Sequence, residues 1–246
     1  MRKILAFIRL GPSILFNYFW WIKKCSKHPE KLPLEVRYRR LRKIIFKTFK
    51  VLNMDVKLIN QDYFVKHKGT SLIVCNHRCF FDPCFFIALS EKPVIFVAKD
   101  SLTKVPFLGK AIKAIDGVFI NRDDVMSQIR TFKDISARVK KGEVSCLLFP
   151  EGTRMKEKGA IKTLPFKDGS LKVAYWGEVD IIPAAMMGSE TLFDKHRYVT
   201  LHFFKPYKYN EFKDLKTTEL SPKIENEVKA KIAELDRDNK ERLLNK

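Results

Sequence analysis

The sequence predicts an α/β protein with a mostly parallel sheet flanked by helices, preceded by an amino-terminal membrane-associating helical segment. Two patterns carry this prediction. From about residue 55 onward, short apolar runs alternate with longer stretches of helical periodicity, which is typical of a parallel sheet covered by helices. Residues 1–52 instead combine apolar and basic side chains without a strand-like pattern. The length of 246 residues, 46% of them hydrophobic, suits one domain of this class.

The first apolar segment, residues 4–22, holds 14 apolar residues in 19 and approaches the ~20 that a membrane-spanning helix needs. Arg9, the Gly11-Pro12 break and Asn17 weaken such a span. We therefore favour an interfacial or re-entrant segment over a spanning helix or a helix docked on the protein core. The aromatic residues expected at headgroup depth are Tyr18, Trp20 and Trp21.

The next segment, residues 34–52, has the periodicity of an amphipathic helix. Its apolar face is formed by Leu34, Tyr38, Leu41, Ile45, Phe49 and Leu52. Its opposite face is formed by Arg40, Lys43, Lys47 and Lys50. Such a helix either packs on the body of the protein or lies in the membrane interface, and its position after an apolar segment favours the interface. Residues 1–52 are therefore predicted to form one membrane-associating helical segment.

The rest of the chain divides into strands and helices of ordinary length. Strands are predicted at 71–75, 94–98, 117–121, 144–149, 180–184 and 199–204. Helices are predicted at 83–90, 106–115, 124–141, 168–177 and 221–243. The last helix is densely charged with alternating signs, so we expect an exposed carboxyl-terminal helix at 216–246 after a body at 55–215.

The charge distribution narrows the class of partner. The formal net charge is +20, from 48 Lys and Arg against 28 Asp and Glu, and residues 1–50 carry +12 of it. A nucleic-acid-binding protein would spread this charge along a groove, whereas a basic and aromatic end favours a phospholipid surface. The five cysteines are an odd number in mostly apolar stretches, which indicates reduced thiols in a protein that faces the cytosol.

Polar residues gather where the predicted strands end. They are Asn76 and His77, Lys99, Arg122, and the run Pro150-Glu151-Gly152-Thr153-Arg154. The carboxyl ends of parallel strands form the ligand crevice of open α/β sheets, so we expect these side chains to share one site. An imidazole, a carboxylate and three cations suit an anionic substrate beside a general base. The Gly-containing turn at 150–154 is either part of an anion site or an ordinary polar turn.

His77 and Asp82 can form the base and the orienting group of a catalytic triad. The nucleophile is missing, because the chain has no G-x-S-x-G elbow, so the hydroxyl that His77 activates would belong to the substrate. Alternatively, Asp82 before Pro83 is only a helix N-cap and His77 is incidental. A zinc site would use Cys75, His77, Cys79 and Cys84. We disfavour it because this set has no C-x-x-C pair.

These motifs resemble those of the glycerolipid acyltransferases, the 1-acylglycerol-3-phosphate acyltransferase family. Asn-His-x-x-x-x-Asp at 76–82 resembles the first motif of that family, 117–122 the second, and 149–154 the third. The apolar, Pro-containing segment 181–184 resembles the fourth. Their order and spacing agree with the family over roughly residues 55–210.

The resemblance implies that residues 55–215 are an acyltransferase catalytic domain. His77 would be the general base for the free hydroxyl of a lysophospholipid, and Asp82 would orient it. The hydroxyl would attack an acyl thioester directly, with no acyl-enzyme, no metal and no bound cofactor. The substrate-binding residues implied are Lys99, Arg122, Glu151, Gly152, Thr153 and Arg154. Among these, Arg122 and Arg154 would hold the acceptor phosphate, and Lys99 either the phosphate or the developing oxyanion.

The Pro-Glu-Gly-Thr-Arg form of the third motif is typical of lysophosphatidate acylation, which forms phosphatidic acid in phospholipid biosynthesis. The expected substrates are lysophosphatidic acid and a thioester of acyl carrier protein or coenzyme A. Glycerol-3-phosphate or another lysophospholipid is the alternative acceptor. A membrane scaffold and a basic nucleic-acid-binding protein are the non-enzymatic alternatives. We expect a membrane-associated protein on the cytoplasmic face that contacts membrane phospholipids and no nucleic acid.

Overall fold

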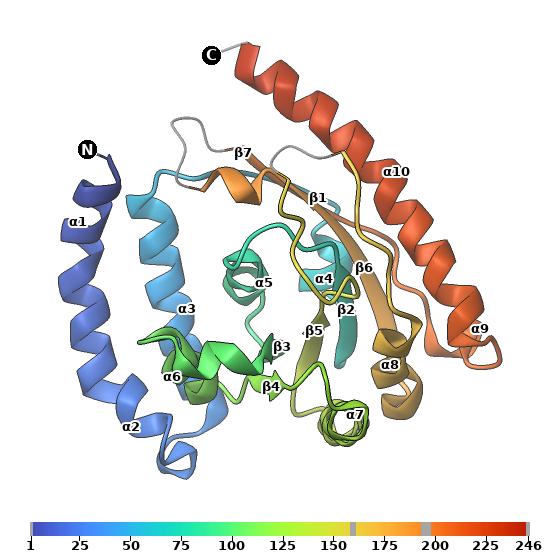
Figure 1. Ribbon diagram of the computed structural model, residues 1–246, viewed down its shortest axis with the longest axis horizontal. Helices are drawn as coiled ribbons and strands as arrows, with labels where there is room; N and C mark the ends of the chain where they lie inside the picture. Colours follow the sequence, from blue (N-terminus) through green and yellow to red (C-terminus); the bar gives the residue numbers. More distant parts are fainter. Residues whose placement is uncertain (1, 158–160, 193–197, 245–246) are drawn as a thin grey trace.

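The computed structural model describes residues 2–157, 161–192 and 198–244, and at its centre lies a seven-stranded sheet of order β1-β7-β6-β2-β5-β3-β4 (Figure 1). The strands are β1 Asp55–Ile59, β2 Ser71–Cys75, β3 Val94–Lys99, β4 Val118–Ile120, β5 Ser145–Leu148, β6 Asp180–Met187 and β7 Tyr198–Phe203. Neighbouring strands run parallel except β6 and β7. The predicted class, a mostly parallel α/β sheet flanked by helices, is confirmed.

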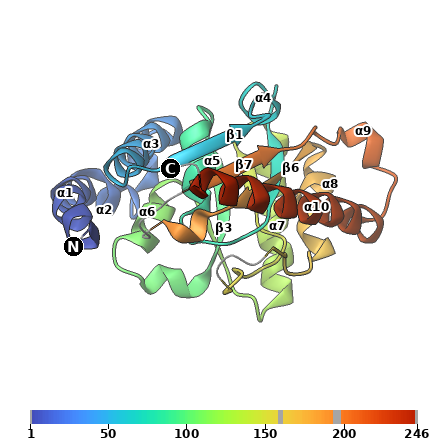
Figure 2. The same cartoon turned by 90° about the horizontal axis from the view of Figure 1, so that it is seen from above.

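Helices lie on both faces of this sheet and beyond one of its ends (Figures 1 and 2). They are α1 Arg2–Asn17, α2 Lys23–Cys25, α3 Leu34–Val51, α4 Asp62–Val65, α5 Asp82–Leu89, α6 Leu108–Ala114, α7 Val125–Lys140, α8 Lys172–Gly177, α9 Tyr209–Phe212 and α10 Thr217–Leu244. Single 3₁₀ turns occur at Pro29–Lys31, Asp100–Lys104, Asp168–Leu171 and Ser189–Thr191.

The two faces of the sheet bury alternate residues of the same strands. In β2, Leu72 and Val74 face a core cluster shared with α7, α8 and α10. Ile73 and Cys75 face the other cluster, which includes residues of α3 and α5. Both faces of β2 are covered, so the strand needs the uninterrupted apolar run LIVC at 72–75.

The sequence prediction misses strand β1 and the short helices α4 and α9, and it places the start of some other helices at different residues. Strand β1 is missed because its sequence, DVKLI, is half-buried at the sheet edge and has no continuous apolar run. The predicted helix 168–177 starts as a 3₁₀ turn, and the helix predicted at 221–243 already begins at Thr217.

The predicted break at Gly11-Pro12 is wrong, because α1 continues through both residues. Pro12 lies on the exposed side of the helix, where water can bind the carbonyl group that its missing N–H leaves free. A π-helix, η1 (Tyr18–Ile22), follows and leads into α2. Within the described residues, no helix is both long and apolar enough to cross a membrane.

The segment from α1 to α2 has two different sides. Trp21, Ile22 and Cys25 pack with Ala114 of α6, and Trp21 is only 2% exposed. The prediction that Trp21 lies at headgroup depth is therefore wrong, because this side chain fills the junction between the segment and the body. The opposite side, which we call the outer apolar face, exposes Ile8, Leu15, Phe16, Phe19 and Trp20.

Helix α3 packs on the body of the protein, and the predicted interfacial role for its apolar face is wrong. Tyr38 and Ile45 are buried in the core cluster of α5, and the rings of Phe49 and Phe85 lie 4.8 Å apart. The Arg37 guanidinium also forms an ion pair with Asp116 at 2.7 Å. The apolar stripe therefore packs against the core, which leaves the basic face of α3 and the exposed side chain of Phe46 for solvent or lipid.

Helix α10 is likewise only half exposed, which corrects the expectation of an exposed carboxyl-terminal helix. It runs across one face of the sheet in both views (Figures 1 and 2). Its buried side chains recur at helical spacing and are Leu220, Ile224, Val228, Ile232 and Leu235. This stripe was obscured in the sequence by the alternating charges of the other faces.

Candidate active site

A reciprocal pair of hydrogen bonds fixes the chain as it leaves β2. The Asn76 side chain donates from Nδ2 to the carbonyl of Met186 at 2.9 Å and accepts at Oδ1 from the Met186 N–H at 2.7 Å. Met186 lies in β6, the neighbour of β2. Buried Asn76 therefore anchors the start of the following turn to a second strand and sets the position of His77.

The structure brings His77 and Asp82 together at the start of α5. His77 Nδ1 lies 2.8 Å from Asp82 Oδ2, and that oxygen also accepts the backbone N–H groups of Arg78 and Cys79 at 2.7 and 2.8 Å. Asp82 is fully buried and directs its carboxylate back into the loop, so the interpretation of Asp82 as a simple N-cap does not describe it. A carboxylate at Nδ1 favours the tautomer with Nδ1 protonated and leaves Nε2 free to accept a proton.

Glu151 binds the backbone of His77. Its Oε1 accepts the backbone N–H of His77 at 3.0 Å, and the side chain is buried. Burial raises the pKa of Glu151 to about 7, although the hydrogen bond from the His77 N–H acts to lower it. Glu151 lines neither of the cavities described below, so the structure places it beside the backbone of the His77 loop and not along a substrate surface.

Gly152 is required by the geometry of the next turn. It has a φ of +68°, in the left-handed region, and a Cβ here would lie 3.1 Å from the Lys167 side chain. Three residues further on, the chain returns to the loop of His77, where the Met155 N–H donates to the His77 carbonyl at 2.8 Å. The two predicted motifs are thus joined through Glu151 and Met155 at His77.

Two cavities meet at His77. The α3 cavity has a volume of about 450 Å³ and extends beneath α3, α5 and α6, where Leu41, Ile45, Ile87 and Ile112 line it. The α7 cavity has a volume of about 320 Å³ and extends between α7 and α8. Both cavities are lined by His77, Val97, Arg122 and Phe149. The His77 and Phe149 rings stack with their centroids 4.0 Å apart, so Phe149 helps hold the imidazole at this junction.

The predicted cations converge on the same junction. Lys99, the last residue of β3, and Arg154 line the α3 cavity, and Arg122 lines both cavities. Partial burial lowers the pKa of Arg122, and the charge of Arg154 lowers it further. Two guanidinium groups close enough to repel each other favour an anion between them. Thr153 also lines the α3 cavity, next to Arg154.

Residues that sequence reasoning missed also hold this site in place. Arg78 is buried, donates from Nε to the Met186 carbonyl at 3.1 Å and pairs with Glu190 at 3.3 Å. The sequence offers one indication of a role for Arg78, because this residue lies inside the first motif. Phe149 ends a predicted strand and opens the third motif, but its stacking on His77 is not predicted. Its contact depends on tertiary packing, which no sequence pattern shows.

The cysteines near His77 are neutral thiols in a buried environment. Burial raises the pKa of Cys79 to about 11 and that of Cys84 to about 12. Neither therefore presents a thiolate near neutral pH. Among the described residues, no group of three or more His, Cys, Asp or Glu side chains is arranged to hold a metal ion.

The chain is similar to a family of known enzymes. A family model described as Acyltransferase matches residues 55–187. A probable 1-acyl-sn-glycerol-3-phosphate acyltransferase of Mycoplasma pneumoniae is 31% identical over 172 residues, which are 68% of this chain and 62% of that protein. The 1-acyl-sn-glycerol-3-phosphate acyltransferase of Escherichia coli is 27% identical over 71% of each chain.

A solved structure is similar over nearly the whole chain. It is the 1-acyl-sn-glycerophosphate (LPA) acyltransferase PlsC from Thermotoga maritima, with a TM-score of 0.70 and 25% sequence identity. The similarity covers 96% of this chain and 98% of that one. It therefore includes the amino-terminal helices, which lie outside the residues that the family model matches.

Proposed function

The chain belongs to the acyltransferase family, and from this premise we propose that it transfers an acyl group from a thioester to the free hydroxyl of 1-acyl-sn-glycerol-3-phosphate. The product is phosphatidic acid, an intermediate of phospholipid biosynthesis. One observation carries the proposal: the His77–Asp82 pair lies beside the cations of Arg122 and Arg154, at the mouth of an apolar cavity. A base, an anion site and space for an acyl chain are what this reaction requires.

His77 acts as the general base. Its Nε2 takes the proton of the acceptor hydroxyl as the oxygen attacks the thioester carbonyl carbon. Collapse of the tetrahedral intermediate breaks the C–S bond, and the proton passes from His77 to the leaving thiol. Asp82 holds the imidazole and stabilises its protonated form. The raised pKa of the Cys79 thiol supports direct transfer without an acyl-enzyme, and the thioester supplies the activation that a bound cofactor would otherwise provide.

The remaining site residues bind the substrates or fix the backbone around them. Arg122 and Arg154 hold the acceptor phosphate, and Lys99 lies on the same cavity wall, where it serves the phosphate or the developing oxyanion. Thr153 offers a hydroxyl to the same ligand. Glu151 and Gly152 set the course of the backbone behind them and are positioning residues.

The outer apolar face of α1 and η1 is the part that we propose contacts membrane phospholipids. Its side chains include Phe16, Phe19 and Trp20, each more than 60% exposed. Exposed aromatic side chains of this kind are typical of the lipid interface. A thioester donor in the cytosol would place the enzyme on the cytoplasmic face of the membrane.

The test is acyl transfer by the purified full chain in mixed micelles. Lysophosphatidate, glycerol-3-phosphate, lysophosphatidylcholine and monoacylglycerol are offered as acceptors, each with acyl-coenzyme A and acyl carrier protein thioesters. We expect lysophosphatidate to be preferred, and Arg154→Ala to raise its KM about tenfold with little effect on monoacylglycerol. Equal use of lysophosphatidate and monoacylglycerol by the wild-type chain would contradict the phosphate assignment.

A further inference from the structure

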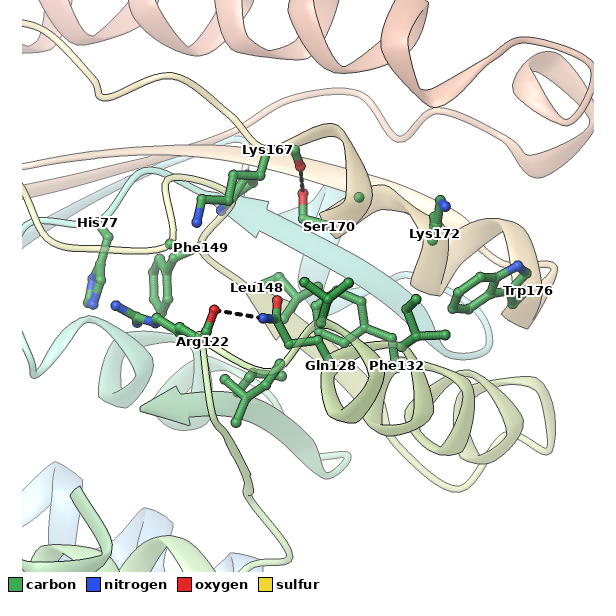
Figure 3. A pocket seen from close by; sticks show the side chains of 17 residues that line it. His77, Arg122, Gln128, Phe132, Leu148, Phe149, Lys167, Ser170, Lys172 and Trp176 are labelled. Atoms are coloured by element: carbon green, nitrogen blue, oxygen red, sulfur yellow. Dashed lines mark hydrogen bonds between the residues drawn. The ribbon is translucent and has the colours of Figure 1, made fainter. Parts of the chain in front are cut away.

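The α7 cavity has a catalytic end and a far end. Figure 3 shows His77 and Arg122 at one end and Trp176 with Lys172 at the other, with Gln128 and Phe132 of α7 between them. The cavity is therefore elongated and leads from the imidazole along α7 to α8. An elongated cavity suits an extended chain better than a compact headgroup.

The walls of this cavity are mostly apolar with a few polar groups along their length. Ile129, Phe132 and Leu148 form much of the apolar wall. The Gln128 amide donates from Nε2 to the Arg122 carbonyl at 2.9 Å, which holds the side chain in the lining. Ser170 lies on the opposite wall. Such a lining suits a chain in which methylene groups alternate with amide groups.

The far end of the cavity is cationic. Lys172 and Trp176 line this end, and Lys133 lies beside the same indole without being a lining residue. The ammonium groups of Lys133 and Lys172 lie 5.9 and 5.8 Å from the centroid of the Trp176 ring. Both lysines are exposed, and neither forms an ion pair within the described part of the chain. Two free ammonium groups beside a half-buried indole favour an anion at this end.

The two cavities open toward different parts of the molecule. The α3 cavity extends beneath α3 and α6, next to the helices that carry the outer apolar face. The α7 and α8 helices lie away from α1 in Figure 1. A ligand that arrives from the lipid side would therefore approach through the α3 side, and one that arrives from water through the α7 side.

We propose that the α7 cavity binds the phosphopantetheine arm of the acyl donor. The thioester lies at His77, the amide groups of the arm lie along Gln128 and Ser170, and the phosphate lies at the Trp176 end, where Lys172 binds it and Lys133 adds a second positive charge. Coenzyme A and acyl carrier protein share this arm, so the same cavity serves either donor. This inference rests on the proposed function and adds to it the residues that recognise the donor. When the C–S bond breaks, the free thiol leaves through this cavity.

The test compares donors that carry the phosphate of the arm with a donor that lacks it. The full chain and its Lys133→Glu/Lys172→Glu variant are assayed with acyl-coenzyme A, acyl carrier protein thioester and a phosphate-free acyl-pantetheine, all carrying one acyl chain. We expect the variant to raise the KM of the phosphate-bearing donors about tenfold, because two charges that attract the phosphate become repulsive. The KM of acyl-pantetheine and that of lysophosphatidate should stay within about twofold. Trp176→Ala should raise the KM of all three donors.

Lys223→Glu is the matched control, because Lys223 of α10 also lies beside an aromatic ring, 5.2 Å from the Tyr207 centroid, but does not line the cavity. It should change none of these constants. Two results would overturn the inference. One is a changed KM for lysophosphatidate in the double variant. The other is a KM for acyl-pantetheine that rises as much as the KM for acyl-coenzyme A.

Binding of coenzyme A and of holo acyl carrier protein, measured by calorimetry, separates the inference from the proposed function. A wild-type chain that transfers no acyl group but binds either molecule, with affinity lost in the double variant, would contradict only the function. Transfer by the wild-type chain with unchanged donor constants in the variant would contradict only the donor site.

Discussion

At the residue scale, the site depends on how firmly His77 is held. Its ring contacts Asp82 at Nδ1 and stacks on Phe149, while its backbone is bound by Glu151 and Met155. These contacts come from two separate stretches of chain, the start of α5 and the segment 149–155. A base whose orientation is set by this many partners loses little freedom on meeting its substrate, which is the advantage of a preorganised site.

Replacing His77 with Ala should lower kcat by about 10²–10⁴-fold, the usual contribution of a general base. Asp82→Asn should lower it severely as well, because an amide no longer favours the Nδ1-protonated tautomer. The double variant should be no worse than His77→Ala, since the two residues act as one unit. Steady-state kinetics check this, with circular dichroism and thermal unfolding as controls for the fold. Near-normal turnover by a folded His77→Ala chain would refute the assignment.

Glu151 should make stability depend on pH. Its pKa rises from 4.5 to about 7 on folding because it is buried, so the unfolded chain loses this proton at lower pH than the folded one. The free energy of unfolding should therefore fall as pH rises from about 4.5 to about 7, by up to about 3 kcal/mol from this group. Glu151→Gln has no such titration and should gain stability relative to wild type across that window.

Denaturant unfolding of both chains at a series of pH values measures this difference. The comparison cancels the other titrating groups, which the two chains share. Stability profiles that run parallel from pH 4 to pH 8 would contradict a raised pKa at Glu151.

At the element scale, the amino-terminal helices divide their apolar surface between the core and the exterior. Helix α3 turns Tyr38 and Ile45 inward, whereas α1 and η1 leave Phe16, Phe19 and Trp20 exposed. Deleting residues 1–52 would therefore uncover the core beside α5, and we expect that truncated chain to misfold. The proposed membrane contact must be tested by substitutions that spare the buried side.

Phe16→Ser, Phe19→Ser and Trp20→Ser together should release the protein from vesicles while the fold survives. Wild-type protein should stay bound at high salt, because each buried aromatic side chain contributes about 1.5–3 kcal/mol that salt does not screen. The matched control is Tyr63→Ser with Leu215→Ser, two exposed apolar residues outside this face. Vesicle sedimentation at low and high salt measures binding. A triple variant that sediments like wild type would refute the outer apolar face as the anchor.

At the scale of the whole molecule, helices α3 and α10 both belong to the folded body. Helix α10 buries five apolar side chains on one face of the sheet, and α3 packs its apolar residues on the other. The boundaries predicted at residues 52 and 216 therefore cut through shared cores. We expect one cooperative unfolding transition and not a stable body with removable ends.

Ile232→Ala should lower the free energy of unfolding by about 2–5 kcal/mol, the usual cost of such a cavity. Ile232 is fully buried beneath α10. Asn226→Ala, on the exposed side of the same helix, is the control and should change stability by less than about 0.5 kcal/mol. Denaturant unfolding checks both. A loss at Ile232 no larger than at Asn226, or a separate early transition of α10, would contradict this view.

The sequence by itself determined the parallel sheet and most of its strands, because a strand buried on both faces must be a continuous apolar run. It also located His77 and Asp82, since a base and its orienting carboxylate are chemically distinctive. It could not find β1, whose half-buried residues carry a weak pattern at the sheet edge.

Only the tertiary structure decided which partner each apolar face would meet. Periodicity shows that Tyr38 and Ile45 share a face, but not whether protein or lipid covers it. The same holds for Trp20 and Trp21, adjacent residues of which one is exposed and the other buried. The approach of Arg122 to Arg154 likewise depends on β4 and β5 both pairing with β3, a long-range arrangement that local sequence does not encode. The local sequence pattern shows which side chains form an apolar face, and tertiary packing decides whether protein, lipid or water contacts that face.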